Sequence, residues 1–334
     1  MTRGASDAAR IRYIEALMPF AGWRTPLLLL GGVGLIASCA AVGLTVSSGA
    51  ASSLSASHAS AGWLSNDVSR AARSASVASA APSSSPSPTD VVEPRCRTDM
   101  VLVESTCVDR FEAHLLEPQA DGTLKRYPHN QRPEKRRYVA ASAASVPPQA
   151  YISQVEAAEA CGNAGKRLCS LREWYRACTG PTRTTYPYGK RYEKGRCNVG
   201  KKHALSLLHG TNPNGWTYDH FNDPELDLLP GFLASSGEYA SCTSSEGVSD
   251  LVGNLHEWVA DRVDHTLPQK LPLPAIIERR IGRNVGNGIF MGGFFSTLNQ
   301  HGEGCNYTTA AHDPRYHDYS TGFRCCADAA APSP

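Results

Sequence analysis

The spacing of its cysteines is the feature that most constrains how this chain can fold. Of eleven cysteines, Cys39 stands alone and the other ten lie between Cys96 and Cys326. None of the ten forms a C-x2-C pair, so the spacing does not fit a zinc ribbon. An even number of cysteines in an exported, loop-rich region predicts five disulfides, which form in an oxidising compartment.

The charge of the chain excludes one class of partner. Its 334 residues carry a formal net charge of +2, which is close to balance. Proteins that bind nucleic acid or an anionic membrane surface through charge have a marked excess of Lys and Arg. We therefore expect no nucleic-acid partner.

Residues 26–46 are apolar and uncharged over 21 positions, enough for a helix to cross a hydrocarbon layer of about 30 Å. The preceding segment, 1–25, carries more basic than acidic residues, and no charged residue follows until Asp67. The excess of positive charge on the N-terminal side predicts that 1–25 is cytoplasmic and that the C-terminal part lies outside the cytoplasm.

A cleaved lipoprotein signal is the alternative for the same stretch. Ile36-Ala37-Ser38-Cys39 resembles a bacterial lipobox, and a start at Met18 would give a short basic region followed by an apolar one. Cys39 would then carry the lipid anchor. Both alternatives attach the chain to a bacterial-type cell membrane, with the domain in the periplasm or on the cell surface.

Composition divides the rest of the chain. Residues 47–95 are rich in Ser, Ala and Pro, a composition that predicts a disordered tether. We place one globular domain at 96–328 and a short tail at 329–334.

Periodicity within the domain predicts few regular elements. An apolar run at 100–103 and alternation of apolar and polar residues at 107–112 favour two strands. Residues 117–148 are expected to be a long surface excursion, and 182–241 are expected to be mostly loops.

Two helices are expected, each opened by a Ser-x-x-Glu capping box, at Ser153 and at Ser170. In the first, the spacing of Val155, Ala158 and Cys161 predicts one face. In the second, a buried face is predicted for Leu171, Trp174 and Cys178.

Four motifs, in this order, give the domain a resemblance. They are Gly165-Lys166-Arg167-Leu168 before the Glu173-Trp174 helix, the stretch from Gly247 to Trp258 (GVSDLVGNLHEW), Gly292-Gly293, and Gly322-Phe323-Arg324-Cys325. With these motifs the chain resembles the formylglycine-generating enzyme family, also called sulfatase-modifying factors. The resemblance implies an α+β fold with little regular secondary structure, a variant of the C-type-lectin-like fold.

The resemblance also implies a site. Active members of the family hold copper with two cysteines in a loop after the Gly-Gly turn and oxidise a substrate cysteine to formylglycine. Soft thiolate ligands suit Cu(I). The corresponding loop here, Phe294 to Gly304, contains no cysteine, so copper is not expected as a cofactor.

The resemblance implies two of the disulfides, Cys161 with Cys325 and Cys178 with Cys305. Elimination then proposes the other three pairs, which are Cys96 with Cys107, Cys169 with Cys326, and Cys197 with Cys242.

A structural calcium ion is the cofactor that the resemblance implies. Its ligands map onto Asp250, Gly253, Leu255 and Glu257, and oxygen donors on a tight turn are what Ca²⁺ prefers. A second family calcium site would use Asn198 and the carbonyl of Val199, without identified further ligands.

A metal ion other than copper is an alternative for the loop and the residues that follow it. The donors available to it are His301, Glu303, Cys305, His312, Asp313, His317 and Asp318. Their spacing lacks the helical i, i+4 pair of many metal sites.

Two functions follow from the sequence. The first is a non-catalytic module that holds a peptide, protein or glycan ligand outside the cytoplasm, and the missing thiolates favour it. The second is a metal-dependent oxidoreductase with altered chemistry, for which Cys305 and His301 are the candidate catalytic residues. The family resemblance alone does not grant activity, because function depends on the residues of the site.

Overall fold

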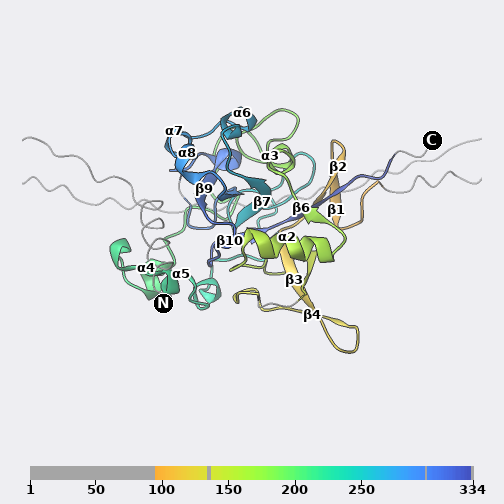
Figure 1. The fold of residues 1–334 in the computed structure, drawn as a ribbon, viewed down its shortest axis with the longest axis horizontal. Helices are drawn as coiled ribbons and strands as arrows, with labels where there is room; N and C mark the ends of the chain where they lie inside the picture. The colour runs from red at the N-terminus through yellow and green to blue at the C-terminus, as the bar shows by residue number, and fades with distance from the viewer. Residues whose placement is uncertain (1–94, 134–136, 298, 332–334) are drawn as a thin grey trace, which may run out of the picture. The chain divides into compact units, whose positions relative to one another are not determined.

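The computed structural model describes residues 95–133, 137–297 and 299–331 (Figure 1). The expected cytoplasmic segment 1–25, the apolar segment 26–46 with Cys39, and the tether up to residue 94 lie outside these ranges and stay predictions. Among the residues that are described, none of the helices has both the length and the apolar character to span a membrane.

Short strands form three small sheets in the described part of the chain. One has the order β1-β2-β11-β6, a second β10-β7-β8-β9, and a third β4-β3-β5. The strands are β1 (Met100–Val103), β2 (Thr106–Asp109), β3 (Ala113–Pro118), β4 (Leu124–Arg126), β5 (Val139–Ser142), β6 (Arg167–Leu168), β7 (His256–Arg262), β8 (Gly288–Met291), β9 (Thr308–His312), β10 (Thr321–Phe323) and β11 (Cys325–Asp328).

The end of the chain joins two of these sheets. Strand β10 pairs in parallel with β7, and β11 inserts between β2 and β6 with antiparallel pairing to both. Arg324 separates the two strands and is completely buried. The C-terminal residues therefore connect segments that are more than two hundred positions apart in the sequence.

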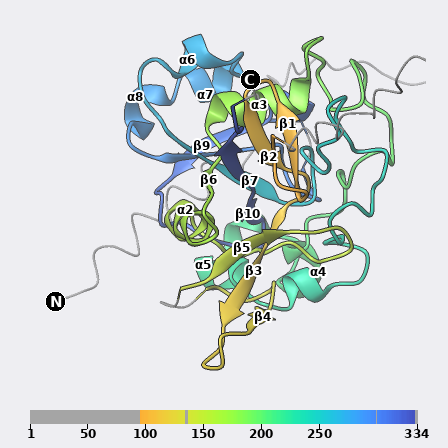
Figure 2. The same cartoon turned by 90° about the vertical axis from the view of Figure 1, so that its right-hand side faces the viewer.

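Helices are short, apart from two. They are α2 (Gln154–Asn163), α3 (Leu171–Thr179), α4 (Leu205–Leu208), α5 (Tyr218–Phe221), α6 (Leu267–Lys270), α7 (Ala275–Glu278) and α8 (Ile281–Asn284), with 3-10 turns η1 (Pro213–Gly215), η2 (Leu226–Leu228) and η3 (Gly304–Asn306). Helices α6, α7 and α8 gather at one end, and the β3–β4 hairpin projects at the opposite end in both views (Figure 1; Figure 2).

Both long helices begin where the sequence predicts. The Ser153 hydroxyl caps α2 and the Ser170 hydroxyl caps α3, and in each case a glutamate three residues on accepts a hydrogen bond from the cap backbone. These reciprocal bonds satisfy backbone N–H groups that a helix start leaves free. The buried face of α3 contains Leu171, Trp174 and Cys178, as expected.

The expected face of α2 is wrong. Val155 is 40% exposed, and the buried positions include Gln154, Ala157 and Cys161. The Gln154 side chain donates hydrogen bonds to the carbonyls of Val259 and Asp261 in β7. A polar residue thus takes a buried position at the start of α2 because strand carbonyls satisfy it, which the apolar spacing alone does not reveal.

The long surface excursion expected at 117–148 is also wrong in part. Strands β3, β4 and β5 form a three-stranded antiparallel sheet there, in which Leu115 pairs with Ala140. Leu115, Tyr138 and Ala140 belong to a core cluster with Ile152. The strands are short, at three to six residues each, so the Pro-containing segments between them dominate the sequence pattern.

Five disulfides hold these elements together, and the expected number is confirmed. The pairs are Cys96–Cys107, Cys161–Cys325, Cys169–Cys326, Cys178–Cys305 and Cys197–Cys242. They are the same pairs that the resemblance and elimination gave. Two of them join the neighbouring Cys325 and Cys326 to the regions of α2 and α3, so the C-terminal strand is fixed to both helices.

The expected fold class is confirmed in its main features. The domain is α+β, has little regular secondary structure and contains five disulfides. That many disulfides are typical of a domain that folds outside the cytoplasm.

Candidate functional site

The turn at Gly292 fixes where the loop after β8 begins. Gly292 has φ of +82°, and a Cβ atom there would lie 2.5 Å from the Leu251 carbonyl oxygen and 3.0 Å from the Trp174 ring. Only glycine fits such a position. The Gly292 carbonyl accepts a hydrogen bond from the Gly253 N–H. The Gly-Gly turn and the GVSDLVGNLHEW motif are therefore in direct contact.

A cavity of about 320 Å³ opens beside this turn. Thr297, Asn299 and Glu303 of the expected site loop line one side of it. Val199 and Val252 contribute apolar surface. The cavity therefore lies at the loop for which the family resemblance implies chemistry.

Three tyrosines dominate the cavity wall: Tyr186, Tyr192 and Tyr307. Burial raises the pKa of Tyr307 to about 12, and its hydroxyl is hydrogen-bonded to the side chains of Thr297 and Thr309. Burial, with Glu303 nearby, raises the pKa of Tyr186 to about 12. Tyr186 and Tyr307 are therefore neutral at physiological pH. Tyr192 is 52% exposed at the opening.

Two polar side chains at the cavity are free to meet a ligand. Within the described residues, the Glu303 carboxylate and the Asn299 amide make no hydrogen bond or ion pair. Both are exposed. A pocket with aromatic walls and a few free polar groups is the usual form of a ligand-binding site.

No thiol is available at this site in the described chain. Cys305 lies in η3, directly after the loop, and is bonded to Cys178 at the end of α3. The candidate catalytic role of Cys305 therefore has no thiolate to support it, because a disulfide sulfur is neither a nucleophile nor a Cu(I) ligand.

The other candidate catalytic residue, His301, faces the interior. It is 7% exposed, and its Nδ1 lies 3.3 Å from the Thr309 hydroxyl. His256 stacks on the ring of Tyr307 and contacts the ring of Phe290 at a tilt. Burial lowers the pKa of His256 well below its usual value, and His301 lowers it further. The His256 imidazole is therefore a neutral member of an aromatic core.

The donors expected for another metal in the loop are engaged separately. His317 is hydrogen-bonded to Asn222, Asp313 accepts from the Arg315 N–H, and Asp318 accepts from Ser320 and Tyr316. Burial lowers the pKa of His312, which stacks on Tyr316. In the ranges the structure describes, no three His, Cys, Asp or Glu side chains are grouped to hold a metal ion.

The expected calcium ligand Glu257 has a different partner. Its two carboxylate oxygens accept hydrogen bonds of 2.6 Å each from the Arg324 guanidinium, and one also accepts from the Trp174 indole at 2.7 Å. All three side chains are buried. A guanidinium bound to both oxygens repels a second cation. The geometry at Glu257 does not fit a calcium ligand.

Asp250 lies near this pair but makes separate contacts. It has φ of +61°, and its carboxylate accepts a 2.6 Å hydrogen bond from the Gly237 N–H. Burial raises its pKa to about 6, although Arg324 acts in the opposite direction. Burial likewise raises the pKa of Glu112 well above its usual value, with Asp250 and Glu257 adding to the rise. The buried Arg324 guanidinium thus interacts with three carboxylates, those of Glu112, Asp250 and Glu257.

The other two expected calcium positions belong to the tight turn before β7. Gly253 has φ of +84°, and a Cβ atom there would lie 2.3 Å from the Asn198 carbonyl oxygen. The Leu255 N–H donates to Glu112 at 3.2 Å. The turn is therefore held by the protein's own hydrogen bonds.

The residues of the second expected calcium site lie beside the same turn. The Asn198 amide donates to Asn254 at 2.8 Å and to the Phe232 carbonyl, while its Oδ1 is buried without a hydrogen-bond partner among the described residues. Val199 lines the cavity. Asn198 thus offers one free oxygen, and no group of acidic side chains completes a site around it in the described ranges.

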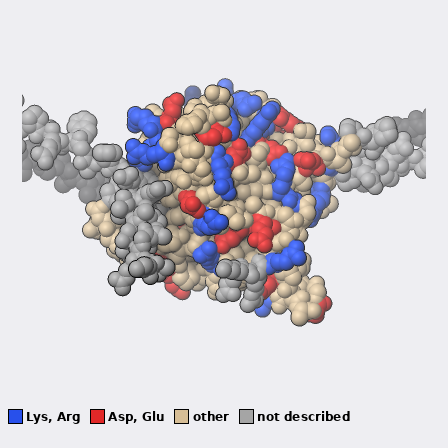
Figure 3. Space-filling model, in the orientation of Figure 1, with Lys and Arg blue, Asp and Glu red and all other residues tan. Residues whose placement is uncertain are grey.

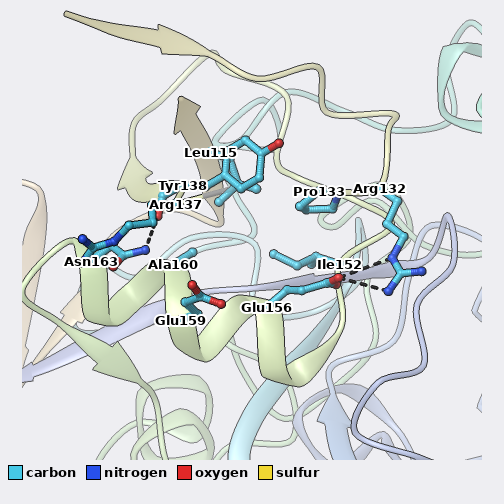
Figure 4. A pocket seen from close by; sticks show the side chains of 10 residues that line it. All are labelled: Leu115, Arg132, Pro133, Arg137, Tyr138, Ile152, Glu156, Glu159, Ala160 and Asn163. Carbon is cyan, nitrogen blue, oxygen red and sulfur yellow. Dashed lines mark hydrogen bonds and ion pairs between the residues drawn. The ribbon is translucent and has the colours of Figure 1, made fainter. Parts of the chain in front are cut away.

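A larger cavity, of about 710 Å³, lies elsewhere, against α2 (Figure 4). Its charged groups are partly neutralised within the wall, since Arg132 and Glu156 form an ion pair at 3.2 Å. Its rim includes Pro133 and Arg137, which flank the undescribed residues 134–136. For these reasons the smaller, tyrosine-lined cavity is the candidate site.

The sequence predicts the loop on one side of the cavity but not the residues on the opposite side. Tyr186, Tyr192 and Val199 come from the loop-rich stretch after α3, for which the sequence predicts loops and a second calcium site at Asn198 and Val199. The available signal is the density of tyrosines, three within residues 186–192: Tyr186, Tyr188 and Tyr192.

With this geometry, comparison with known proteins defines the class. Residues 102–329 match the sulfatase-modifying factor enzyme 1-like domain. The match covers well over half of the chain, so the protein belongs to the sulfatase-modifying factor family. None of the curated proteins matches the chain.

Solved structures give more distant matches. The Major Tropism Determinant I1 Variant is 14% identical with a TM-score of 0.36, over 71% of this chain and 54% of that chain. CarF is 18% identical with a TM-score of 0.27, over 49% of this chain and 48% of that chain. The chain spans about half the length of the solved structures it matches.

Proposed function

We propose that the protein is a non-catalytic, ligand-binding member of the sulfatase-modifying factor family, held at the outer side of a cell membrane. The observation that carries this proposal is the chemistry of the cavity beside Gly292, whose wall contains tyrosines and oxygen donors and no cysteine. Its ligand is a peptide, protein or glycan segment that enters the cavity from outside.

The loss of oxidase chemistry follows from the ligand preferences of copper. Cu(I) is held by soft donors, and the loop residues Thr297, Asn299 and Glu303 offer only hard oxygen or amide donors. Each of the ten cysteines from Cys96 to Cys326 is part of a disulfide. The buried imidazole of His301 cannot replace two thiolates. The alternative, a metal-dependent oxidoreductase with altered chemistry, has no specific support in the site.

The first test is an activity assay. The purified full-length protein is incubated with a sulfatase-type cysteine peptide, copper and oxygen, and aldehyde formation is measured by mass spectrometry beside an active family member. We expect no aldehyde above the enzyme-free background. Aldehyde that rises with protein concentration and disappears in Cys305→Ser would make Cys305 catalytic and refute the proposal.

The second test concerns the membrane. Residues 26–46 are proposed to anchor the chain, either as an uncleaved helix or as a lipoprotein signal ending at Cys39. Substitution Cys39→Ala in cells labelled with a radioactive fatty acid separates the two. Loss of label and of membrane attachment would identify a lipoprotein, whereas unlabelled protein that stays in the membrane fraction would identify a spanning helix. Full-length protein found only in the cytoplasm would refute the proposed location.

A further inference from the structure

The segment that supplies the outer wall of the cavity is strongly basic. Residues 186–202 contain six Lys or Arg against a single acidic residue, Glu193. The whole chain has a net charge of only +2, and the face drawn in Figure 3 intersperses both signs. The positive charge of this segment is therefore a local feature.

Most of these cations are not neutralised by the protein. Arg196 is paired with Glu193 at 2.9 Å, and Lys201 donates to backbone carbonyls. The other four are exposed and form no ion pair with any described residue: Lys190, Arg191, Lys194 and Lys202. Unpaired cations on one short segment attract an anionic partner and increase its association rate.

The same segment places tyrosines beside these charges. Tyr192 lies between Arg191 and Lys194 in the sequence, and its ring centroid is 6.0 Å from that of Tyr186 inside the cavity. Tyr186 also stacks on Tyr188, over which the Arg196 guanidinium lies at 5.2 Å. Tyrosine and arginine are the residues most enriched where proteins bind one another tightly.

From these observations we infer that the cavity and its basic wall bind an acidic peptide segment of a partner protein, with one aromatic or apolar side chain of that segment inside the cavity. The inference rests on the proposed function and names its ligand. The carboxylates of the segment lie outside, against Arg191 and Lys194. Its anchor side chain lies between the tyrosines and against Val252.

The position of Glu303 favours a peptide over an acidic polysaccharide. Glu303 is the one charged side chain that lines the cavity in the described chain. A sugar ring that carries its own carboxylate or sulfate would bring a negative charge against it. A peptide separates its charged side chains from a neutral anchor, so it satisfies both the basic wall and the cavity.

Fluorescence anisotropy with the full-length protein tests the inference. The probe is a short labelled peptide of Asp, Glu and Ser around one Phe, and its counterparts replace Phe with Ser, or the acidic residues with Lys or with Ser. We expect the acidic Phe peptide to bind most tightly, and to bind more weakly as salt rises. Loss of the Phe should weaken binding by roughly tenfold, as expected for one buried anchor.

Charge reversal on the protein supplies the matched control. Arg191→Glu with Lys194→Glu should weaken binding of the acidic peptide by at least roughly tenfold. Arg279→Glu with Arg283→Glu makes the same charge change at two exposed residues of the α7–α8 region without ion pairs in the described chain, and should leave binding unchanged. Tyr192→Ala should weaken it without changing its dependence on salt.

The outcomes separate the ligand class from the proposed function. Equal effects of the two charge reversals would refute the acidic peptide. If the neutral or basic peptide binds best and Tyr192→Ala still weakens it, the inference fails and the proposed function stands. Dextran sulfate that binds more tightly than the peptide and displaces it would identify a polysaccharide and refute the inference. If neither peptide nor polysaccharide binds, both the inference and the proposed function fail.

Discussion

The two walls of the cavity are built in opposite ways. The inner wall is the turn at Gly292 and the motif that ends in Trp258. There the Gly253 N–H donates to the Gly292 carbonyl, and the buried Arg324 donates to Glu257. The outer wall, residues 186–202, has exposed cations and short turns. A single disulfide, Cys197–Cys242, anchors it. The inner wall therefore contains residues that stabilise the fold, whereas the outer wall contains exposed side chains that are available to bind a ligand.

This contrast explains how family membership and a site loop without cysteine coexist in one chain. Replacing a buried, hydrogen-bonded residue of the inner wall leaves its partner without a hydrogen bond, which lowers the free energy of unfolding. The exposed residues of the outer wall and the site loop, among them Tyr192, Asn299 and Glu303, contact solvent and can change without such a cost. The predictions below test the contrast, beginning with the largest expected effect.

The first prediction concerns the ion pair that supports the inner wall. Arg324→Ala should lower the free energy of unfolding by about 3–5 kcal/mol, because it leaves the buried Glu257 carboxylate unpaired. Arg167→Ala removes an ion pair with Glu173 in which the Arg167 side chain is 43% exposed. This substitution should cost about 0–1 kcal/mol. Urea denaturation of both variants measures the difference. Equal losses of unfolding free energy would show that the buried pair stabilises the fold no more than the exposed one.

The second prediction compares the disulfide of the outer wall with the one that joins α3 to η3. Replacing both cysteines by alanine in either Cys178–Cys305 or Cys197–Cys242 should cost about 2–5 kcal/mol. The first closes a sequence separation of 127 and the second one of 45, so loop-closure entropy predicts about 1 kcal/mol more for the first. A larger loss for Cys197–Cys242 would mean that the outer wall, too, determines stability.

The third prediction uses the raised pKa of Asp250, which lies at about 6. The folded state then holds a proton that the unfolded state has already released, so stability should fall as the pH rises from about 4 to about 6. Asp250→Asn removes this loss and should stabilise the protein by on the order of 1–3 kcal/mol at pH 7, with little change at pH 4. Melting temperatures across this pH range provide the measurement, and a parallel shift at all pH values would contradict the assignment.

The fourth prediction concerns the outer wall. Tyr192→Ala should change the free energy of unfolding by less than about 0.5 kcal/mol, since the ring is half-exposed and makes no hydrogen bond in the described chain. Its effect should be found in ligand binding instead. Denaturation curves that shift by several times that amount would place Tyr192 in the supporting core.

The smallest expected effect is that of calcium. Because Arg324 already binds both oxygens of Glu257, we expect the same melting temperature in excess calcium and in excess chelator. The sequence resemblance alone leads to the opposite expectation. A chelator-induced drop that is absent in Glu257→Gln would restore the calcium site.

Much of the fold was predictable, and the reasons are local. The capping boxes at Ser153 and Ser170 specify helix starts through bonds between residues three apart. The wrong face of α2 and the missed sheet of β3, β4 and β5 have a different origin. There, partners distant in sequence decide burial: the β7 carbonyls accept from Gln154, and Leu115 packs in a cluster with Ile152.

By itself, the sequence determined the family, the number of disulfides, the two helices and the absence of cysteine from the site loop, because each depends on residue identity or short spacing. Only the tertiary structure decided that Arg324 binds Glu257, that His301 turns inward, and that Tyr186 and Tyr192 face the site loop across a cavity. The ion pair and the cavity bring together residues that are far apart in the chain, and the position of His301 depends on the direction of its side chain. Their energies come from burial and charge in the folded protein, which no local pattern records.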